Sequence, residues 1–270
     1  MRTLVHLSDL HFGRVDATLV PALIATVNAI GPDVVAVSGD LTQRARSAQF
    51  IAARAFLDAL AAPRVVVPGN HDVPLHNVLA RFARPLDKYR RYISADLEPA
   101  FVDGQIAVLG LNSARSLTFK NGRINRAQLE RVRARLAPLP DAVTKVVVTH
   151  HPLDLPAGYG ERDLVGRARL AMQAFADCGV DLLLAGHLHL GSTGDTAARY
   201  QSLGRVALVV QAGTATSTRG RGEANSFNVL RIEGPRVSVE RWAWYETAAT
   251  FKPAMSEAFV QENGAWRRGM

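Results

Sequence analysis

The sequence predicts an α/β protein, and three observations support that prediction. Short runs of Val, Leu and Ile alternate with amphipathic segments along the first two thirds of the 270-residue chain. Polar motifs directly follow most of these runs, as expected where strands end at a ligand-binding edge. After about residue 195 the pattern changes to strand-like runs separated by Gly, Asn and Pro turns. No internal repeat or linker is visible, so we expect one domain over residues 1–270.

Each expected element follows from its own pattern of apolar residues. Continuous apolar runs before a polar turn predict strands at 2–9, 33–40, 64–70, 105–113, 145–151 and 180–187. Apolar positions at helical spacing predict helices at 17–30, 48–62, 126–137 and 168–178. Turn residues bound three further runs that predict antiparallel strands at 205–213, 226–234 and 236–246. We expect residues 73–100 to form helices over or beside the functional site.

The composition is that of an ordinary globular protein, with 48% hydrophobic and 21% charged residues. No apolar run reaches the roughly 20 residues that a membrane span requires. The N-terminus lacks the pattern of a secretory signal. The single cysteine, Cys178, excludes an internal disulfide, fits a reducing compartment and is expected to be a buried thiol. We therefore expect the protein to be cytoplasmic.

The net charge of +8 comes from arginines that are spread along the chain rather than gathered in one block. Such a charge attracts phosphate-bearing substrates and leaves peripheral contact with an anionic membrane open. A small phosphodiester is the expected partner, and we expect no stable complex with nucleic acid. The sequence does not define the oligomeric state, and a homodimer is compatible with it.

Five separated segments place potential metal ligands at the ends of predicted strands. They are Asp9-Leu10-His11, Gly39-Asp40, Gly69-Asn70-His71-Asp72, His150-His151 and Gly186-His187-Leu188-His189. Each glycine lets the backbone turn sharply or approach a neighbouring segment closely. On an extended strand end, alternation would point Asp9 and His11 to the same side. One such segment is more often a capping or hydrogen-bonded group, but five in order at strand ends predict a metal site.

These five blocks resemble the signature of the calcineurin-like metallophosphoesterase superfamily. The resemblance extends from Asp9 to His189. It implies a four-layer αββα sandwich, in which two mixed β-sheets are flanked by helices and the metals lie at one sheet edge. The β-rich C-terminal third would then supply the second sheet.

The resemblance also implies a centre of two metal ions. Its ligands would be Asp9, His11 and His189 for one ion, Asn70, His150 and His187 for the other, and Asp40 between them. A carboxylate can share its two oxygens between ions that lie ~3.5–4 Å apart, the separation used in two-metal hydrolysis. The mixed nitrogen and oxygen ligands suit divalent or trivalent transition-metal ions such as Mn, Fe or Zn better than Mg or Ca.

In the mechanism that the resemblance implies, a water bridging the two ions loses a proton and attacks phosphorus. His71 would lie beside the leaving group as a proton donor or charge stabiliser. Asp72 would either hydrogen-bond His71 and fix its orientation or simply cap the turn. His151 is expected to pack rather than to contact substrate. His6 and His76 are expected to be core or surface histidines, with His76 a weak candidate for substrate contact.

Further motifs resemble bacterial class III cyclic nucleotide phosphodiesterases. These motifs are Leu111-Asn112-Ser113, Gly122-Arg123-Ile124 and Gln128-Leu129. The GNHD sequence at residues 69–72 favours the same group over UDP-2,3-diacylglucosamine hydrolases, which usually carry GNRD. The leading prediction is therefore a dinuclear metal-dependent phosphodiesterase that hydrolyses 3′,5′-cyclic nucleotides or related small phosphodiesters.

Four alternatives remain open. One is a UDP-2,3-diacylglucosamine-type diphosphate hydrolase at the membrane face, suggested by the net charge and the aromatic segment 242–245, although its alternation favours core packing. Another is a broad-specificity phosphodiesterase. A DNA-processing nuclease subunit would need additional domains or coiled-coil insertions, and none is visible. A metal-free binding module would need an incomplete ligand set, whereas every expected ligand is present.

Overall fold

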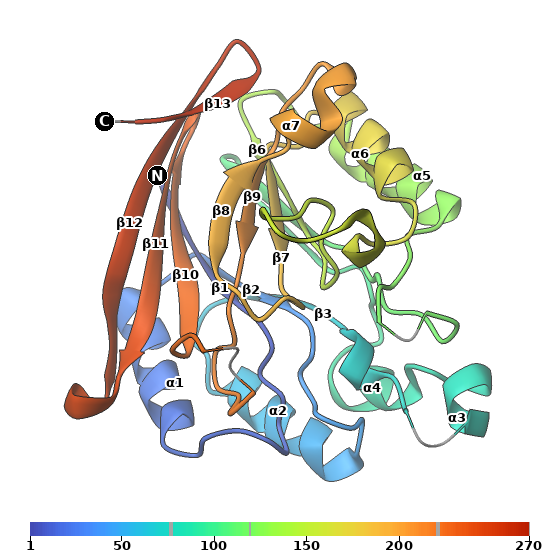
Figure 1. The fold of residues 1–270 in the computed structure, drawn as a ribbon, viewed down its shortest axis with the longest axis vertical. Coiled ribbons are helices and arrows are strands. Elements are labelled where there is room, and N and C mark those ends of the chain that lie inside the picture. Colours follow the sequence, from blue (N-terminus) through green and yellow to red (C-terminus); the bar gives the residue numbers. More distant parts are fainter. Residues whose placement is uncertain (76–77, 119, 220–221, 270) are drawn as a thin grey trace.

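Two β-sheets pack face to face, and helices cover their outer faces (Figure 1). The computed structural model describes residues 1–75, 78–118, 120–219 and 222–269. The architecture is the αββα sandwich of two mixed sheets that the sequence predicted, and this prediction is confirmed.

The first sheet contains seven strands in the order β13-β12-β11-β10-β1-β2-β3. Its parallel half consists of β1 (Arg2–Leu7), β2 (Val34–Ser38) and β3 (Arg64–Val67). Its antiparallel half consists of β10 (Ser226–Glu233), β11 (Arg236–Tyr245), β12 (Thr250–Glu262) and β13 (Ala265–Arg268). The two halves meet where β1 and β10 pair antiparallel.

The second sheet contains six strands in the order β4-β5-β6-β7-β9-β8. Its central strands run parallel and are β5 (Ile106–Gly110), β6 (Thr144–Val148), β7 (Leu182–Ala185) and β9 (Leu208–Gln211). Short antiparallel strands close both edges, namely β4 (Ala100–Val102) and β8 (Ser192–Asp195).

Alternation along the strands explains why both faces of each sheet are covered. In β2, Val34 and Ala36 face the second sheet, whereas Val35 and Val37 pack against the helices of the outer layer. All four side chains are fully buried. Strands buried on both faces are continuously apolar, so these runs are visible in the sequence as short hydrophobic blocks.

Helices form the two outer layers. α1 (Leu19–Ile30) and α2 (Ser47–Asp58) contribute to the core outside the first sheet, and α5 (Arg126–Leu136) and α6 (Ala168–Asp177) to the core outside the second. The expected helices of residues 73–100 are α3 (Val78–Ala83) and α4 (Asp87–Tyr92), and α4 packs against α2. The remaining helical segments are α7 (Ala197–Tyr200) and 3-10 turns at Asn70–Asp72, Glu161–Asp163, Gln201–Leu203 and Glu246–Ala248.

The expectation that the C-terminal third forms the second sheet is wrong. Strands β10 to β13 extend the first sheet, because β10 pairs with the edge of β1 that β2 leaves free. The run at 205–213 also differs from its antiparallel expectation, since β9 lies parallel to β7. Strands β12 and β13 were not predicted, because β12 is largely exposed and contains Pro253, which hide a strand pattern.

Three further expectations concern burial and the membrane. Cys178 is buried, as predicted. Trp242 and Trp244 pack against the outer core of the first sheet, whereas Tyr245 is exposed. Among the described residues, no helix is both long enough and apolar enough to cross a bilayer.

Candidate metal centre

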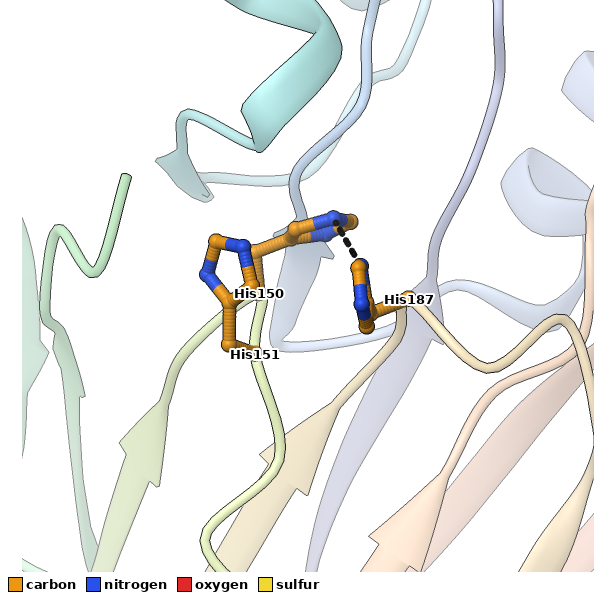
Figure 2. A group of neighbouring side chains, drawn as sticks. All are labelled: His150, His151 and His187. Carbon is orange, nitrogen blue, oxygen red and sulfur yellow. Dashed lines mark hydrogen bonds between the residues drawn. The ribbon is translucent and has the colours of Figure 1, made fainter. Parts of the chain in front are cut away.

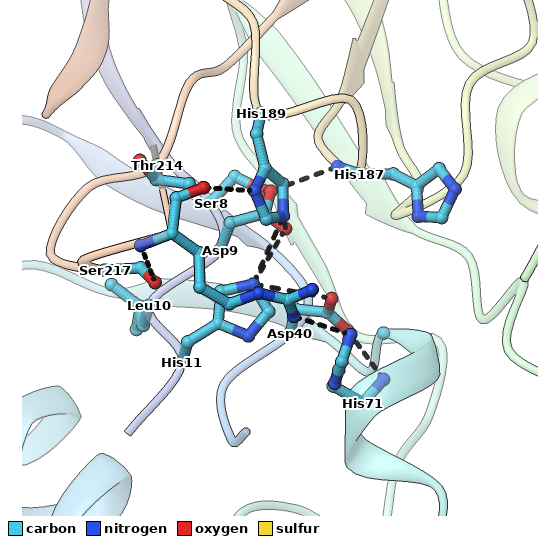
Figure 3. Close-up of polar contacts among 12 residues, drawn as sticks. Ser8, Asp9, Leu10, His11, Asp40, His71, His187, His189, Thr214 and Ser217 are labelled. Atoms are coloured by element: carbon cyan, nitrogen blue, oxygen red, sulfur yellow. Dashed lines mark hydrogen bonds and ion pairs between the residues drawn. The ribbon is translucent and has the colours of Figure 1, made fainter. Parts of the chain in front are cut away.

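The five predicted segments meet at one end of the sandwich. Each follows the carboxyl end of a parallel strand: β1, β2 and β3 of the first sheet, and β6 and β7 of the second. Parallel strands that point the same way bring the residues after them to one edge. Loops that are more than 170 residues apart in sequence therefore contact each other, as in the hydrogen bond from the His187 backbone N–H to Asp9 (Figure 3).

Asp9, His11 and His189 form the first cluster of the site. Asp9 Oδ1 lies 3.1 Å from His189 Nε2 and 3.5 Å from His11 Nε2. The two imidazole Nε2 atoms are 3.2 Å apart. The other oxygen, Asp9 Oδ2, accepts hydrogen bonds from the Ser8 hydroxyl at 2.6 Å and the His187 backbone N–H at 3.0 Å. The protein thus anchors Asp9 through one oxygen and directs the other at two imidazoles.

Asn70, His150 and His187 form the second cluster. Asn70 Oδ1 lies 3.1 Å from both His150 Nε2 and His187 Nδ1. The two imidazole nitrogens face each other at 3.3 Å, as Figure 2 shows. Nitrogen and oxygen ligands about 2.0–2.2 Å from one ion are themselves roughly 3 Å apart, so these separations fit a ligand set.

Asp40 lies between the two clusters. Its Oδ2 is 3.8 Å from His11 Nε2 in the first cluster and 3.4 Å from His150 Nε2 in the second. Its Oδ1 accepts a hydrogen bond of 2.8 Å from the His71 backbone N–H. The sequence suggested that two carboxylate oxygens would be divided between two ions. In the structure a single oxygen, Oδ2, faces both clusters.

Backbone carbonyls fix which imidazole nitrogens can bind a cation. His150 Nδ1 donates to Ser38 O at 2.7 Å, and His189 Nδ1 donates to Arg219 O at 3.2 Å. A carbonyl oxygen only accepts, so both Nδ1 atoms carry hydrogen and both Nε2 lone pairs face the site. There they meet carboxylate and amide oxygens, which are also acceptors. Buried acceptors that face one another need a cation or a proton between them, so the donor set fits metal ions.

The pKa shifts of Asp40 and His150 also arise because these buried groups face each other. Burial alone would raise the pKa of the Asp40 carboxyl, but the facing imidazole of His150 outweighs it and holds that pKa far below its usual range. Burial alone would lower the pKa of His150, but the Asp40 carboxylate and the hydrogen bonds outweigh it and raise that pKa to about 9. The buried Asp40 carboxylate and the His150 imidazole therefore each stabilise the charged form of the other.

The convergence of Asp9 and His11 does not come from strand alternation, and that expectation is wrong. Strand β1 ends at Leu7, and both residues have left-handed backbones, with φ of 53° and 51°. The same conformation occurs at three other proposed ligands, Asp40 (51°), His187 (71°) and His189 (57°), but not at Asn70 or His150. Left-handed φ is unfavourable for residues other than glycine, so the fold holds strain at this site.

Two motif glycines are required by close approach rather than by positive φ. A Cβ on Gly69 would lie 2.1 Å from Asp40 Oδ1, and a Cβ on Gly186 would lie 1.8 Å from Ser8 Oγ and 2.6 Å from Asp9 Oδ2. Only glycine allows these loops to lie against the carboxylates.

The predicted contact between Asp72 and the ring of His71 is not formed among the described residues. Asp72 is buried and accepts hydrogen bonds from the backbone N–H groups of Leu41, Thr42 and Gly69. Asp72 therefore ties the loop after β3 to the loop after β2, as the capping alternative expected. Burial, reinforced by the nearby Asp40 charge, raises its pKa to about 6.

The ring of His71 is oriented by Gln43 instead. His71 Nδ1 lies 2.9 Å from Gln43 O, and Nε2 lies 3.0 Å from Arg219 Nη1. The ring also packs edge-on against His11, with the centroids 5.0 Å apart. His71 is thus beside the first cluster without belonging to it.

The remaining histidines occupy different surroundings. His151 is fully buried beside His150 and His187, with Nδ1 2.8 Å from Ser113 Oγ, in line with the expected packing role (Figure 2). His6 is a core histidine with Nε2 2.9 Å from Ser38 Oγ. His76 lies outside the described residues.

A cavity of about 200 Å³ opens on the site. Besides residues of the predicted segments, it is lined by three that sequence reasoning missed, namely Lys120, Tyr159 and Arg219. None of the three belongs to a spacing pattern that marks a ligand. Lys120 pairs with Asp163 at 2.9 Å.

Comparison with known proteins identifies the family of the chain. The sequence model of the calcineurin-like phosphoesterases matches residues 2–191, so the chain belongs to that family, as the motifs predicted. The chain is similar to the 3′,5′-cyclic adenosine monophosphate phosphodiesterase CpdA of Escherichia coli K12, with 30% identity over 178 residues. That match covers 61% of this chain and 59% of CpdA.

A second relative is the glycerophosphodiester phosphodiesterase GpdQ of Enterobacter lignolyticus SCF1. It is 29% identical over 171 residues, which cover 59% of this chain and 60% of GpdQ. The chain thus matches less than two thirds of the length of either relative.

Solved structures show the same fold at low sequence identity. A dimetal phosphatase from Danio rerio superposes with a TM-score of 0.69 and 13% identity, over 97% of this chain and 99% of that one. Purple acid phosphatase PPD1 from yellow lupin (Lupinus luteus) seeds superposes with a TM-score of 0.63 and 13% identity, over 93% of this chain and 52% of that one.

The close approach at Gly186 predicts a specific defect. Gly186→Ala places a methyl group against Ser8 and Asp9, so we expect the variant to bind less metal while unfolding at a similar or slightly lower temperature. Gly104→Ala is the matched control, because nothing lies within 4 Å of its added Cβ. Metal analysis after gel filtration measures the effect, and equal metal content in both variants would contradict this account of the glycine.

Proposed function

We propose that this chain is a dinuclear metal-dependent phosphodiesterase that hydrolyses 3′,5′-cyclic nucleotides or related small phosphodiesters. The observation that supports it most directly is Asp40 Oδ2, which faces an imidazole of each ligand cluster. The family and the cyclic nucleotide and glycerophosphodiester activities in the names of the two relatives support the same reaction class.

The proposed ligands are those that the sequence indicated. Asp9, His11 and His189 would hold one ion, Asn70, His150 and His187 would hold the other, and Asp40 would serve both. The site combines three carboxylate or amide side chains with four imidazoles, so we propose Mn, Fe or Zn rather than Mg or Ca. Two such ions, when bound, lower the pKa of a water and offset negative charge on the phosphoryl oxygens.

The chain's own residues organise the reaction around that centre. Asp40 accepts the His71 backbone N–H and so holds the turn that carries both Asn70 and His71. His71 lines the cavity beside the first cluster, where it faces the leaving group of a bound diester. Because Gln43 O takes the Nδ1 hydrogen, the leaving oxygen would interact with the Nε2 side of the ring.

A diphosphate hydrolase at the membrane face is the second candidate. The aromatic segment that first suggested it packs partly in the core, but other apolar side chains support it. Leu75, Val78, Leu79, Phe82 and Leu117 are 44–82% exposed, and Leu75 follows the Asn70–Asp72 turn closely. Such a group of exposed apolar residues is typical of a surface that meets lipid or protein.

Hydrolysis assays test the proposed function. We expect the Mn-loaded protein to cleave bis(p-nitrophenyl) phosphate and cyclic AMP, to lose both activities on chelation and to regain them when Mn is added back. Cleavage of the synthetic diester without cyclic AMP would reject the cyclic nucleotide substrate. A preference for an acylated nucleotide diphosphate sugar would favour the second candidate, and no activity towards any of these would reject the proposal.

The shared position of Asp40 predicts a ranking of variants. Asp40→Asn keeps the shape of the side chain but weakens a ligand to both ions, so we expect it to lose most bound metal and nearly all activity. His71→Ala removes no ligand and should keep its metal while kcat falls by roughly 10²-fold, the lower end of general acid–base effects. Metal analysis and kcat together measure the ranking. Small and equal losses would show that Asp40 is misassigned.

A further inference from the structure

We propose that Arg219 is a substrate-binding residue whose guanidinium holds an oxygen of the phosphoryl group beside His71. This inference rests on the proposed function, because it takes the phosphoryl group to occupy the cavity that opens on the ligand clusters. Nothing in the motifs of the ligand segments indicates this residue, which lies in the loop between β9 and β10.

The loop that carries Arg219 is tied to the segment that carries Asp9 and His11. The Ala215 backbone N–H donates to Ser8 O at 3.1 Å, and the Thr216 hydroxyl donates to Leu10 O at 2.8 Å. Further along, the Thr218 backbone N–H donates to Arg14 O at 3.1 Å. These contacts use backbone and threonine atoms, so replacing the Arg219 side chain leaves them in place.

Arg219 contacts the site through both its backbone and its side chain. Its carbonyl oxygen lies 3.2 Å from His189 Nδ1. This contact orients the ring so that the other nitrogen, Nε2, faces Asp9. Its backbone N–H donates to Ser217 Oγ at 3.1 Å, which orients the residue locally. Its Nη1 donates to His71 Nε2 at 3.0 Å, and the side chain lines the cavity.

The charge of the guanidinium is available to a ligand. Within the described part of the chain, no carboxylate forms a salt bridge with Arg219, and its one side-chain hydrogen bond uses a single donor. A guanidinium has five donors in a planar fork that matches two phosphate oxygens. By contrast, Lys120, the other cation on the cavity, already pairs with Asp163.

The hydrogen-bond pattern also assigns different parts to the arginine and the histidine. His71 Nδ1 faces a carbonyl and Nε2 faces a guanidinium, so the ring donates at Nδ1 and accepts at Nε2. In this arrangement Arg219 is the donor that points into the cavity. A phosphoryl oxygen that accepts this hydrogen bond in place of His71 leaves His71 Nε2 free to interact with the leaving oxygen.

The test compares Arg219→Gln and Arg219→Lys with the native, metal-loaded protein. Inorganic phosphate serves as the binding probe, measured by calorimetry and as a competitive inhibitor of bis(p-nitrophenyl) phosphate hydrolysis. We expect Arg219→Gln to weaken phosphate binding and to lower kcat/KM by about ten- to a hundredfold, the usual loss for a charged hydrogen bond. Arg219→Lys should recover part of both, because it restores charge without the planar fork.

Arg169→Gln is the matched control, since it removes the same charge from an exposed position on α6. It should leave phosphate binding and kcat/KM within twofold of native. Metal analysis separates binding from structure: we expect Arg219→Gln to keep its full metal content. Loss of metal would mean that Arg219 acts through His189, and unchanged phosphate affinity would mean that it does not touch substrate; either result overturns the inference.

The proposed function and this inference can fail separately. If the native protein binds phosphate in an Arg219-dependent way but cleaves no diester, the proposed function is wrong and the anion site stands. If the native protein cleaves diesters and Arg219→Gln has the same KM and the same phosphate affinity, the proposed function stands and the role of Arg219 is wrong.

Discussion

The candidate metal centre depends on a cluster of buried hydrogen-bond acceptors that face one another. Asp9 Oδ1, Asp40 Oδ2, Asn70 Oδ1 and several imidazole lone pairs converge within hydrogen-bonding distance, and most of these side chains are fully buried. Such an arrangement is unfavourable unless positive charge lies between the acceptors. Accordingly, the facing Asp40 carboxylate outweighs burial and raises the pKa of His150 to about 9. A pair of metal ions would supply positive charge at fixed positions.

The fold supplies the rigidity that this cluster needs. Parallel strands of both sheets end at the same edge, and each loop is held by hydrogen bonds to another loop: Asp72 joins the loops after β2 and β3, and Asp9 joins those after β1 and β7. Five residues at the site account for most of the non-glycine residues with positive φ in the described part of the chain. Strain of this kind persists only where surrounding contacts enforce it, which is typical of functional sites.

Much of this was predictable, because the ligand segments follow apolar strands in sequence and the strands bring them together. The αββα layers and the family followed from the same motifs. Other features depend on contacts that have no local signal. The left-handed backbone of Asp9, the carbonyls that fix the tautomers of His150 and His189, and the backbone partners of Asp72 arise only when distant loops meet. Arg219 and the addition of β10–β13 to the first sheet were missed for the same reason.

In the proposed centre, one oxygen of Asp40 serves both ligand clusters. Anomalous diffraction from crystals of the Mn-loaded protein would locate the ions. We expect two peaks about 3.5–4 Å apart, both within bonding distance of Asp40 Oδ2. A single peak, or two peaks of which one has no contact with Asp40, would contradict it.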